Sequence, residues 1–159
     1  GEGYRYHMTS NFHDEGGFPA TNNHENAKAS MERLHRKIER CLDEIIMLEE
    51  TYTDDAEIAV FAYGSTARSA KNAVRSAREQ GIKAGLLKTM TLWPFPQAAV
   101  RQLGEKVKAI IVPEMNTGQL VSEVERAVRQ LPVDVIPLNR YDGLMIRPEQ
   151  ILAKIKEVI

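Results

Sequence analysis

The second part of the chain alternates short apolar runs with amphipathic segments. Residues 58–63 read IAVFAY, a nearly continuous apolar run that is typical of a strand buried on both faces. Further apolar runs at 82–87, 107–112 and 133–136 predict three more strands, the last of them ended by Pro137. Such runs, separated by helical segments, are typical of parallel sheets.

The segments between and after these runs have a helical period. Ala67, Ala70, Val74 and Ala77 fall on one face of a helix that Gly81 ends. Further helices are predicted over 97–104, after Gly118 and from Pro148, a favourable first-turn position for proline. The order of strands and helices predicts a three-layer α/β/α fold with a mostly parallel sheet of 4–5 strands.

The first 52 residues follow a different pattern. Residues 1–25 are rich in Gly, Asn, His and Thr without an apolar period, which predicts an extended interdomain arm. Residues 26–52 are predicted to form an amphipathic helix, and residues 53–159 the α/β domain. The helix stripe consists of Met31, Leu34, Ile38, Cys41, Ile45 and Leu48. This stripe is narrow, so docking on another domain or subunit and packing on the chain's own domain are both open.

Charge divides the chain at nearly the same place. Residues 1–55 contain 6 basic and 12 acidic residues, whereas residues 56–159 contain 15 and 10. An acidic arm thus precedes a mildly basic domain, although ordinary solvated faces explain the same pattern. The net charge of −1 favours neither a nucleic-acid nor a membrane partner, and no apolar run is long enough for a membrane span.

The sequence contains few residues and motifs that could bind a cofactor. Cys41 is the single cysteine, which fits a reducing cytoplasm and leaves any iron–sulfur cluster to another chain. A phosphate loop, a dinucleotide fingerprint and a thiamine-diphosphate signature are all absent from the sequence. We therefore expect no catalytic residue, cofactor site or metal site in this chain.

The best local anion site is the turn after the first predicted strand. Ser65, Thr66 and Arg68 lie where the strand ends and a helix begins, so backbone N–H groups and the helix dipole favour an anion. Arg68 can add a bidentate contact. A plain helix cap by Ser65 or Thr66 explains the same residues, and the two interpretations stay open.

Interface candidates lie in the loops after the later strands. Trp93 and Phe95, in a loop with two prolines, form either a binding surface or a cover on the sheet edge. Glu114, Asn116 and Gln119 follow the third predicted strand, where α/β sheets place ligands.

Two more interface candidates, His13 and Asp14, lie in the arm. They are predicted to contact a neighbouring domain. With His7 and Glu15 they are also possible metal ligands, but their spacing fits no standard metal motif.

Several segments, taken in order, resemble the 2-oxoacid:ferredoxin oxidoreductases. They are YRYHMT at 4–9, HDEGG at 13–17, GSTARSA at 64–70, EQGIKAGLL at 79–87, LWPFP at 92–96 and VPEMNTGQL at 112–120. The resemblance covers essentially the whole chain and is closest to the alpha subunit of the 2-oxoglutarate type. Residues 9–12, TSNF, depart from the Thr-Gly-Leu that this family often has.

The resemblance implies a fold like the carboxy-terminal domain of transketolase. It implies a parent enzyme that decarboxylates a 2-oxoacid on thiamine diphosphate and Mg, passes electrons through iron–sulfur clusters to ferredoxin, and transfers the acyl group to coenzyme A as a substrate. This chain is then expected to be the carboxy-terminal part of the alpha subunit, to serve in packing and assembly, and to be inactive alone. The start at Gly1, without an initiator methionine, is expected of a segment of a longer protein.

The partners that the resemblance implies are protein partners in the cytoplasm. They are the preceding thiamine-binding domain of the same subunit, the beta subunit, gamma and delta subunits, and ferredoxin through the complex. Two other functions stay open: the corresponding domain of another thiamine enzyme, of the 2-oxoacid dehydrogenase beta-subunit or transketolase type, and a free-standing regulatory module that binds an anion at Ser65, Thr66 and Arg68.

Overall fold

The computed structural model of the chain describes residues 2–3 and 11–159 and divides into two compact units. The first unit is Gly1–Glu44 and the second, the α/β unit, is Ile45–Ile159. The arm segment at 4–9, with His7, lies outside the described residues. Among the described residues, no helix has both the length and the apolar character needed to cross a membrane.

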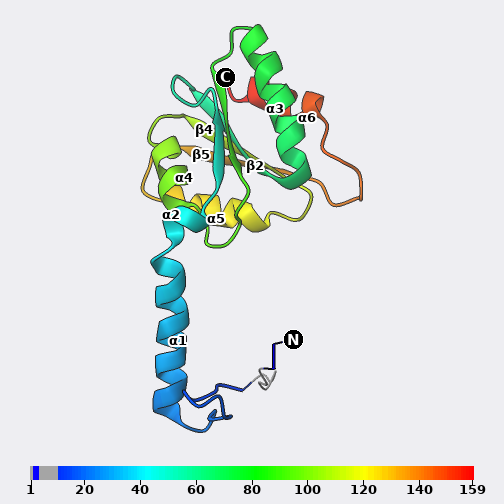
Figure 1. The fold of residues 1–159 in the computed structure, drawn as a ribbon. Helices are drawn as coiled ribbons and strands as arrows, with labels where there is room; N and C mark the ends of the chain where they lie inside the picture. Colours follow the sequence, from blue (N-terminus) through cyan, green and yellow to red (C-terminus); the bar gives the residue numbers. More distant parts are fainter. Residues whose placement is uncertain (1, 4–10) are drawn as a thin grey trace. The chain divides into compact units, whose positions relative to one another are not determined.

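The α/β unit is built on one five-stranded sheet with the strand order β1-β3-β2-β4-β5. The strands are β1 (Leu48–Thr51), β2 (Ile58–Tyr63), β3 (Ala84–Thr89), β4 (Ala109–Glu114) and β5 (Asp134–Asn139). β2 pairs in parallel with β3 and with β4, and β4 pairs in parallel with β5. β1 pairs antiparallel with β3 at one edge. The predicted mostly parallel sheet is confirmed (Figure 1).

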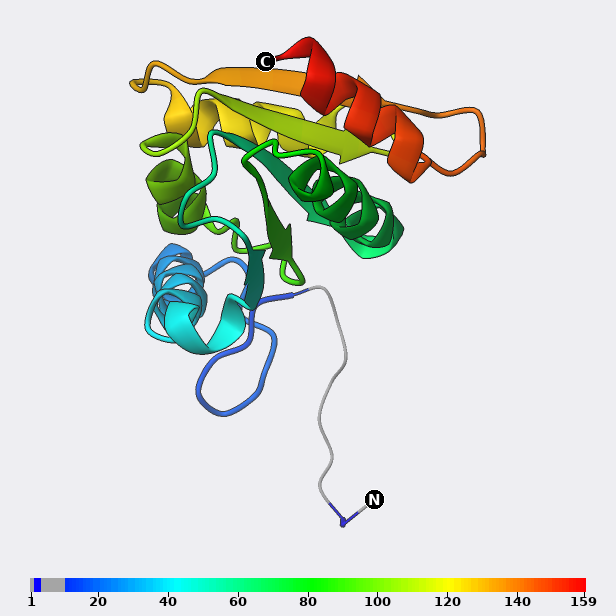
Figure 2. The same ribbon diagram turned by 90° about the horizontal axis from the view of Figure 1, so that it is seen from above.

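Helices cover both faces of this sheet. They are α3 (Gly64–Glu79) and α6 (Pro148–Glu157) on one face, and α4 (Gln97–Gly104) and α5 (Gln119–Val128) on the other (Figure 2). Alternate residues of β2 serve the two cores: Val60 packs with the α3 and α6 side, and Phe61 packs with the α4 and α5 side. This alternation explains why β2 is apolar at every position, and it confirms the three-layer α/β/α fold.

The single helix predicted over 26–52 is wrong beyond Glu39. The structure has α1 (His24–Glu39), the short α2 (Leu42–Ile45) and then strand β1. β1 forms because the edge of β3 is free to pair with it: Leu48 lies opposite Thr89, and Glu49 lies opposite Lys88. Since β1 belongs to the sheet, the α/β unit begins at residue 45 and not at residue 53.

Helix α1 itself begins with a side-chain cap, the Asn26 amide donating to Asn23 Oδ1 at 3.1 Å. No residue of α1 is buried, and Met31 and Leu34 are 44% and 47% exposed. The predicted apolar stripe therefore remains uncovered along α1.

Some predicted strand limits are also corrected. The fourth predicted strand continues past Pro137 to Asn139, because β5 pairs with β4 alone and the missing N–H of an edge proline costs no ladder bond. β3 begins at Ala84 rather than at Ile82, because the Ile82 amide still donates to Ala77 O at the end of α3. Gly81, with a φ of +78°, allows this helix ending.

Candidate functional site at the carboxyl edge of the sheet

The parallel strands end together at one edge of the sheet, which we call the carboxyl edge. The chain passes from β2 through α3 to β3 on one side, and from β3 through α4 to β4 on the other side of β2. The winding therefore reverses between β2 and β4, and open α/β sheets bind ligands at such reversal points. Tyr63 ends β2 and Glu114 ends β4, so the two residues meet there.

The carboxylate of Glu114 is fully buried at this point and is surrounded by donors. Its oxygens accept hydrogen bonds from the Leu120 amide at 2.9 and 3.1 Å and from the Val121 amide at 3.0 Å. The Tyr63 hydroxyl and Asn116 Nδ2 each donate to Oε1 at 3.1 Å. Glu114 thus satisfies the first turn of α5, whose dipole stabilises the negative charge. This helix end is already occupied by the chain's own anion.

Asn116 completes the network. Its Oδ1 accepts from the Gly118 amide at 2.7 Å and the Gln119 amide at 3.0 Å, while its Nδ2 donates to the Tyr63 hydroxyl at 3.0 Å. Burial, followed by the negative charge of Glu114, raises the pKa of Tyr63 above 10.0. The hydroxyl therefore stays protonated and keeps donating to Glu114. The arrangement is a rigid polar support rather than a proton-transfer site, because the Glu114 acceptors are all in use.

The structure separates Thr66 from Ser65 and Arg68 by burial. Thr66 is buried and its hydroxyl donates to Tyr63 O at 2.7 Å, within the first turn of α3. Ser65 and Arg68 are exposed, and Ser65 Oγ lies 3.6 Å from Met115 Sδ. The cap interpretation is wrong, because α3 begins at Gly64 with Tyr63 as its N-cap and without a side-chain cap, while an anion at Ser65 and Arg68 stays a prediction.

Trp93 and Phe95 have different environments. Phe95 is half-buried and contacts Phe61 edge to face, with ring centroids 5.8 Å apart, so it anchors the loop on the core. Trp93 is 71% exposed, and its peptide bond to Pro94 is cis. Phe95 thus covers the sheet, and Trp93 is available to a partner. Gln119 is exposed at the start of α5.

His13 and Asp14 belong to the first unit, in a tight turn. The Asp14 amide donates to Phe18 O at 2.9 Å, the Phe18 amide donates to Asp14 Oδ1 at 2.9 Å, and His13 O accepts from Asn26 Nδ2 at 3.2 Å. In residues 2–3 and 11–159, no group of three or more His, Cys, Asp and Glu side chains is placed to hold a metal. The contact of His13 and Asp14 with a neighbouring domain stays a prediction.

Most exposed large apolar side chains of the α/β unit gather at the carboxyl edge. Ten large apolar residues of this unit are exposed, and only Tyr52 and Ile159 lie elsewhere. The other eight, which we call the apolar rim, are Met47, Met90, Leu92, Trp93, Met115, Tyr141, Leu144 and Met145. Met47 precedes β1 but belongs to this edge, because its carbonyl accepts from the Met90 amide at 3.0 Å. Apolar clusters of this kind mark interaction surfaces.

One part of the apolar rim is held in a fixed loop by Arg140. The guanidinium donates to Asp142 at 2.7 and 3.0 Å and to Met145 O at 3.1 Å, and it lowers the pKa of Asp142 to about 2 through its hydrogen bonds. The Arg140 amide also donates to Glu114 O at 2.9 Å, which ties the loop to β4. Tyr141, 75% exposed, is thus presented on an ordered backbone.

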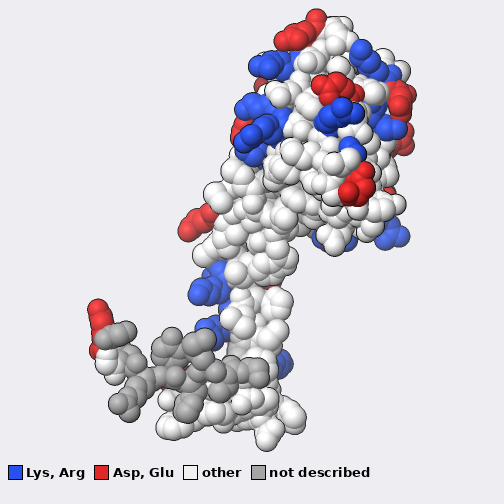
Figure 3. Space-filling model, turned by 90° about the vertical axis from the view of Figure 1, so that its right-hand side faces the viewer, with Lys and Arg blue, Asp and Glu red and all other residues white. Residues whose placement is uncertain are grey.

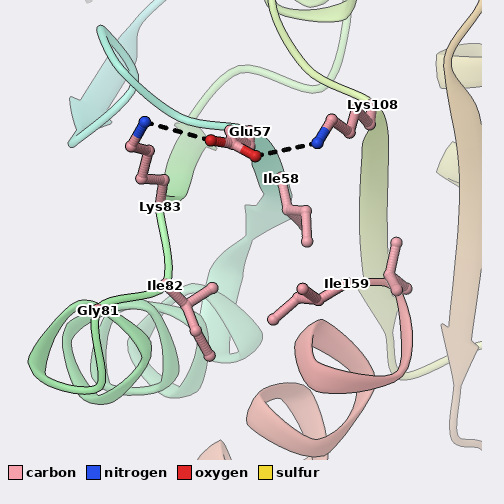
Figure 4. A pocket seen from close by; sticks show the side chains of 8 residues that line it. Glu57, Ile58, Gly81, Ile82, Lys83, Lys108 and Ile159 are labelled. Atoms are coloured by element: carbon pink, nitrogen blue, oxygen red, sulfur yellow. Dashed lines mark hydrogen bonds and ion pairs between the residues drawn. The ribbon is translucent and has the colours of Figure 1, made fainter.

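The opposite, amino edge of the sheet has a different character. Glu57, directly before β2, accepts from Lys83 at 3.2 Å and Lys108 at 3.0 Å, the residues before β3 and β4 (Figure 4). Hydrogen bonds from Lys108, then Lys83, lower the pKa of Glu57. A hollow of about 220 Å³ lies beside them, and Ile58 and Ile82 are among its lining residues. Charges of both signs are also intermixed over the face of the α/β unit seen in Figure 3.

Tyr63 and most of the apolar rim were missed in the sequence. Tyr63 reads as the last residue of an apolar strand, and only the pairing of β2 with β4 brings its hydroxyl to Glu114. A usable signal exists for the rim: Met90, Met115 and Leu144 stand in loops after strand ends, where they serve neither face of the sheet.

Comparison with known proteins agrees with this architecture. The chain is 39% identical over 155 residues to 2-oxoglutarate synthase subunit KorA of Methanothermobacter marburgensis, covering 98% of this chain and 41% of that protein. It is 43% identical over 153 residues to KorA of Methanothermobacter thermautotrophicus, covering 96% and 40%. Ketoisovalerate oxidoreductase subunit VorB of the latter organism is 38% identical over 125 residues, covering 79% and 35%. The chain thus spans about two fifths of the length of these KorA relatives.

Solved structures give the same result for the fold. A 2-oxoglutarate:ferredoxin oxidoreductase from Magnetococcus marinus, with 2-oxoglutarate, coenzyme A and succinyl-CoA bound, is similar with a TM-score of 0.82 and 28% identity, over 96% of this chain and 26% of that chain. A split-gene transketolase shares the fold, with a TM-score of 0.60 and 17% identity over 69% of this chain and 41% of that one. The family model of the pyruvate:ferredoxin oxidoreductase core domain II matches residues 56–151, so it takes in strands β2–β5 and the carboxyl edge. With its sheet, its relatives and this match in agreement, the chain belongs to the pyruvate:ferredoxin oxidoreductase core domain II family.

Proposed function

We propose that this chain is an assembly domain in the alpha subunit of a thiamine-diphosphate-dependent 2-oxoacid:ferredoxin oxidoreductase, of the 2-oxoglutarate type. Its carboxyl edge docks on the thiamine-binding part of that enzyme. The KorA relatives, named as subunits of 2-oxoglutarate synthases, support the reaction class and a multi-subunit setting. The location of the parent enzyme in the cytoplasm and its beta, gamma and delta partner subunits remain predictions.

The observation that carries this proposal is the distribution of polar and apolar groups at the carboxyl edge. Glu114 and its donors are buried there, while Trp93 and Tyr141 are 71% and 75% exposed. Exposed aromatic and methionine side chains over a rigid base are typical of the centre of a protein interface. Docking removes this apolar surface from water, which favours association.

Two features of this chain argue against cofactor sites at the start of α5 and at Cys41. Both Glu114 oxygens are occupied by backbone and side-chain donors, so the start of α5 offers no free site for a diphosphate. The one cysteine, Cys41, cannot hold an iron–sulfur cluster. Thiamine diphosphate, Mg and the clusters would therefore be held by the rest of the enzyme, with coenzyme A entering as a substrate.

Substitution at the apolar rim tests the proposed docking. We expect Trp93→Ala and Tyr141→Ala, introduced into the complete enzyme, to weaken subunit assembly about tenfold or more each, since buried aromatic residues dominate interface energies. Analytical ultracentrifugation over a concentration series measures this effect. The control is Ile159→Ala, a large apolar residue that is 75% exposed and lies away from the rim. Assembly of both aromatic variants at the wild-type concentration would contradict the proposal.

Calorimetry on the 159-residue chain tests the assignment of the cofactors to other parts of the enzyme. We expect no binding of thiamine diphosphate with Mg at micromolar concentrations and no turnover of 2-oxoglutarate. Micromolar binding would place a cofactor site within this chain and contradict its role as an assembly domain.

A further inference from the structure

Four basic residues form a stripe along α1 and its C-cap: Arg33, Arg36 and Lys37 lie within the helix, and Arg40 follows it directly. We call these four residues the basic stripe. We propose that the basic stripe is a docking surface for a carboxylate-rich segment of a partner polypeptide. The inference rests on the proposed function in one respect, because the partner is sought in the assembled enzyme. All residues of the basic stripe belong to the first unit.

The spacing of the four residues places them on one side of the helix. Positions 33, 36, 37 and 40 follow the i, i+3, i+4, i+7 pattern, so the stripe is about 10 Å long at 1.5 Å per residue. All four side chains are exposed, and together with Cys41 they line a shallow hollow of about 340 Å³. The stripe is thus a continuous positive surface rather than four separate charges.

The charges of the stripe are not compensated. Within the part of the chain that the structure describes, the ion pair on α1 joins Lys28 to Glu32 at 3.9 Å, and none of the four stripe residues makes one. Arg33 and Lys37, like Arg36 and Arg40, are like-charged pairs at i and i+4, which destabilise a helix. An opposing row of carboxylates relieves this repulsion, so the stripe selects for an acidic partner.

A purely structural explanation covers only part of the stripe. Cations in the last turn of a helix interact favourably with its dipole, which accounts for Arg36 and Lys37. Arg33 lies nearly a full turn before them in the direction of the amino end and gains little from the dipole. Moreover, residues 1–55 contain 12 acidic and only 6 basic residues, and four of those six are on this stripe. The clustering therefore exceeds what the helix end requires.

The neighbouring apolar stripe favours a protein segment over a nucleic acid or a free phosphate. Lys37 lies three residues after Leu34 and four before Cys41, so the basic stripe borders the apolar one. Met31 and Leu34 are 44% and 47% exposed, and α1 buries no residue. A partner that covers both stripes must present apolar side chains beside carboxylates, as an acidic amphipathic helix does.

Zero-length cross-linking of the assembled enzyme with a carbodiimide, which joins lysines to contacting carboxylates, gives the first test. We expect Lys37 to be joined to Asp or Glu of another segment. Lys28, on the same helix but paired with Glu32, is the matched control and is expected to give the link to Glu32. Lys37 links confined to the first unit of its own chain would overturn the inference.

Charge removal with a helix-forming residue gives the second test. We expect Arg33→Gln combined with Arg36→Gln to weaken assembly at least tenfold at low salt, with the difference disappearing as salt screens the contact. The helix content by circular dichroism is expected to stay constant or rise, because like-charge repulsion is removed; a structural role predicts a fall. Lys28→Gln is the control. Unchanged assembly at every salt concentration, or co-purification of nucleic acid that the double variant loses, counts against the inference.

The two proposals can fail separately. If the rim variants dissociate the enzyme and the stripe variants do not, the inference is wrong and the proposed function stands. If only the stripe variants dissociate it, the carboxyl edge is not the docking face, and the inference stands.

Discussion

The two edges of the sheet distribute polar and apolar groups in opposite ways. At the amino edge, the charged residues Glu57, Lys83 and Lys108 face solvent and Ile58 is buried beneath them. At the carboxyl edge, Glu114 is buried and Trp93 is exposed. The amino edge has its charged groups outside and its apolar groups inside, as a water-facing surface does. The carboxyl edge has the reverse arrangement, which is typical of an interaction surface.

The contrast between the edges separates groups that stabilise the fold from groups that do not. Polar groups buried at the carboxyl edge hold α5 and the loop after β5 in place, so their loss is costly. The exposed apolar groups above them make little contribution to folding, because they gain nothing from burial within this chain. Substitutions at the two edges can therefore separate stability from assembly.

The largest effect on stability is expected at Glu114. Glu114→Ala leaves the Leu120 and Val121 amides and the Tyr63 hydroxyl without their acceptor, which we expect to lower the free energy of unfolding by about 3 kcal/mol. Urea denaturation followed by circular dichroism measures it. Glu114→Gln, which keeps one acceptor oxygen, is the matched variant and is expected to cost less. A loss below about 1 kcal/mol for Glu114→Ala would show that the network is not needed for the fold.

At the amino side of the sheet, Gly85 is a tightly packed position. A Cβ atom there would lie 2.8 Å from Tyr52 O and 2.9 Å from the Cβ of Ala56, in the loop before β2. Overpacking of this kind gives an expected loss of about 2 kcal/mol for Gly85→Ala in the same urea experiment. Adding Ala56→Gly removes one of the two contacts and is expected to recover part of the loss. If the changes in the free energy of unfolding simply add, the contact between residues 85 and 56 does not cause the loss, and the expectation is contradicted.

High pH is expected to weaken the carboxyl edge selectively. Because the pKa of Tyr63 is raised in the folded chain, the folded state keeps its proton at pH values above 10.0, where the unfolded chain loses it. The stabilisation is complete below pH 10.0 and is lost as the pH rises through the folded pKa. Urea midpoints measured from pH 8 to 11 on wild type and Tyr63→Phe test this loss of stability, which is expected to be steeper in the wild type. Equal slopes in the two proteins would contradict it.

The smallest stability effect is expected at the apolar rim. Tyr141→Ser removes a ring that is 75% exposed, and we expect the free energy of unfolding of the chain to change by less than about 0.5 kcal/mol. Arg140→Ser, which releases the loop from Asp142 and Met145, is expected to cost more. A loss above about 1 kcal/mol for Tyr141→Ser would mean that the rim serves the fold, and the contrast between the two edges would disappear.

Sequence patterns predicted the sheet well because its strands are buried on both faces. The run at 58–63 has no polar position before Tyr63. Between helical segments, such a run forms a strand that helices cover on both faces. Pro148, at the first turn of α6, was equally readable, because proline fits there and not within a helix.

Local patterns failed where the neighbours in space decide the outcome. Residues 48–51 continue a helical apolar period, yet they form β1 because β3 offers an unpaired edge. Trp93 and Phe95 look alike in the sequence, but only Phe95 reaches the ring of Phe61. Tertiary context also separated Thr66 from Ser65 and Arg68.

The order of residues alone sets the alternation of buried strands and helices, the absence of cofactor motifs and the concentration of basic residues between 33 and 40. These properties follow from the types and spacing of the residues, because the spacing alone fixes which side chains share one side of a helix or strand. The burial of Glu114 beneath an exposed apolar rim, in contrast, becomes visible only in the folded chain. The reason is physical: exposure and hydrogen-bond satisfaction depend on which strand ends lie side by side, and the sheet order β1-β3-β2-β4-β5 sets that.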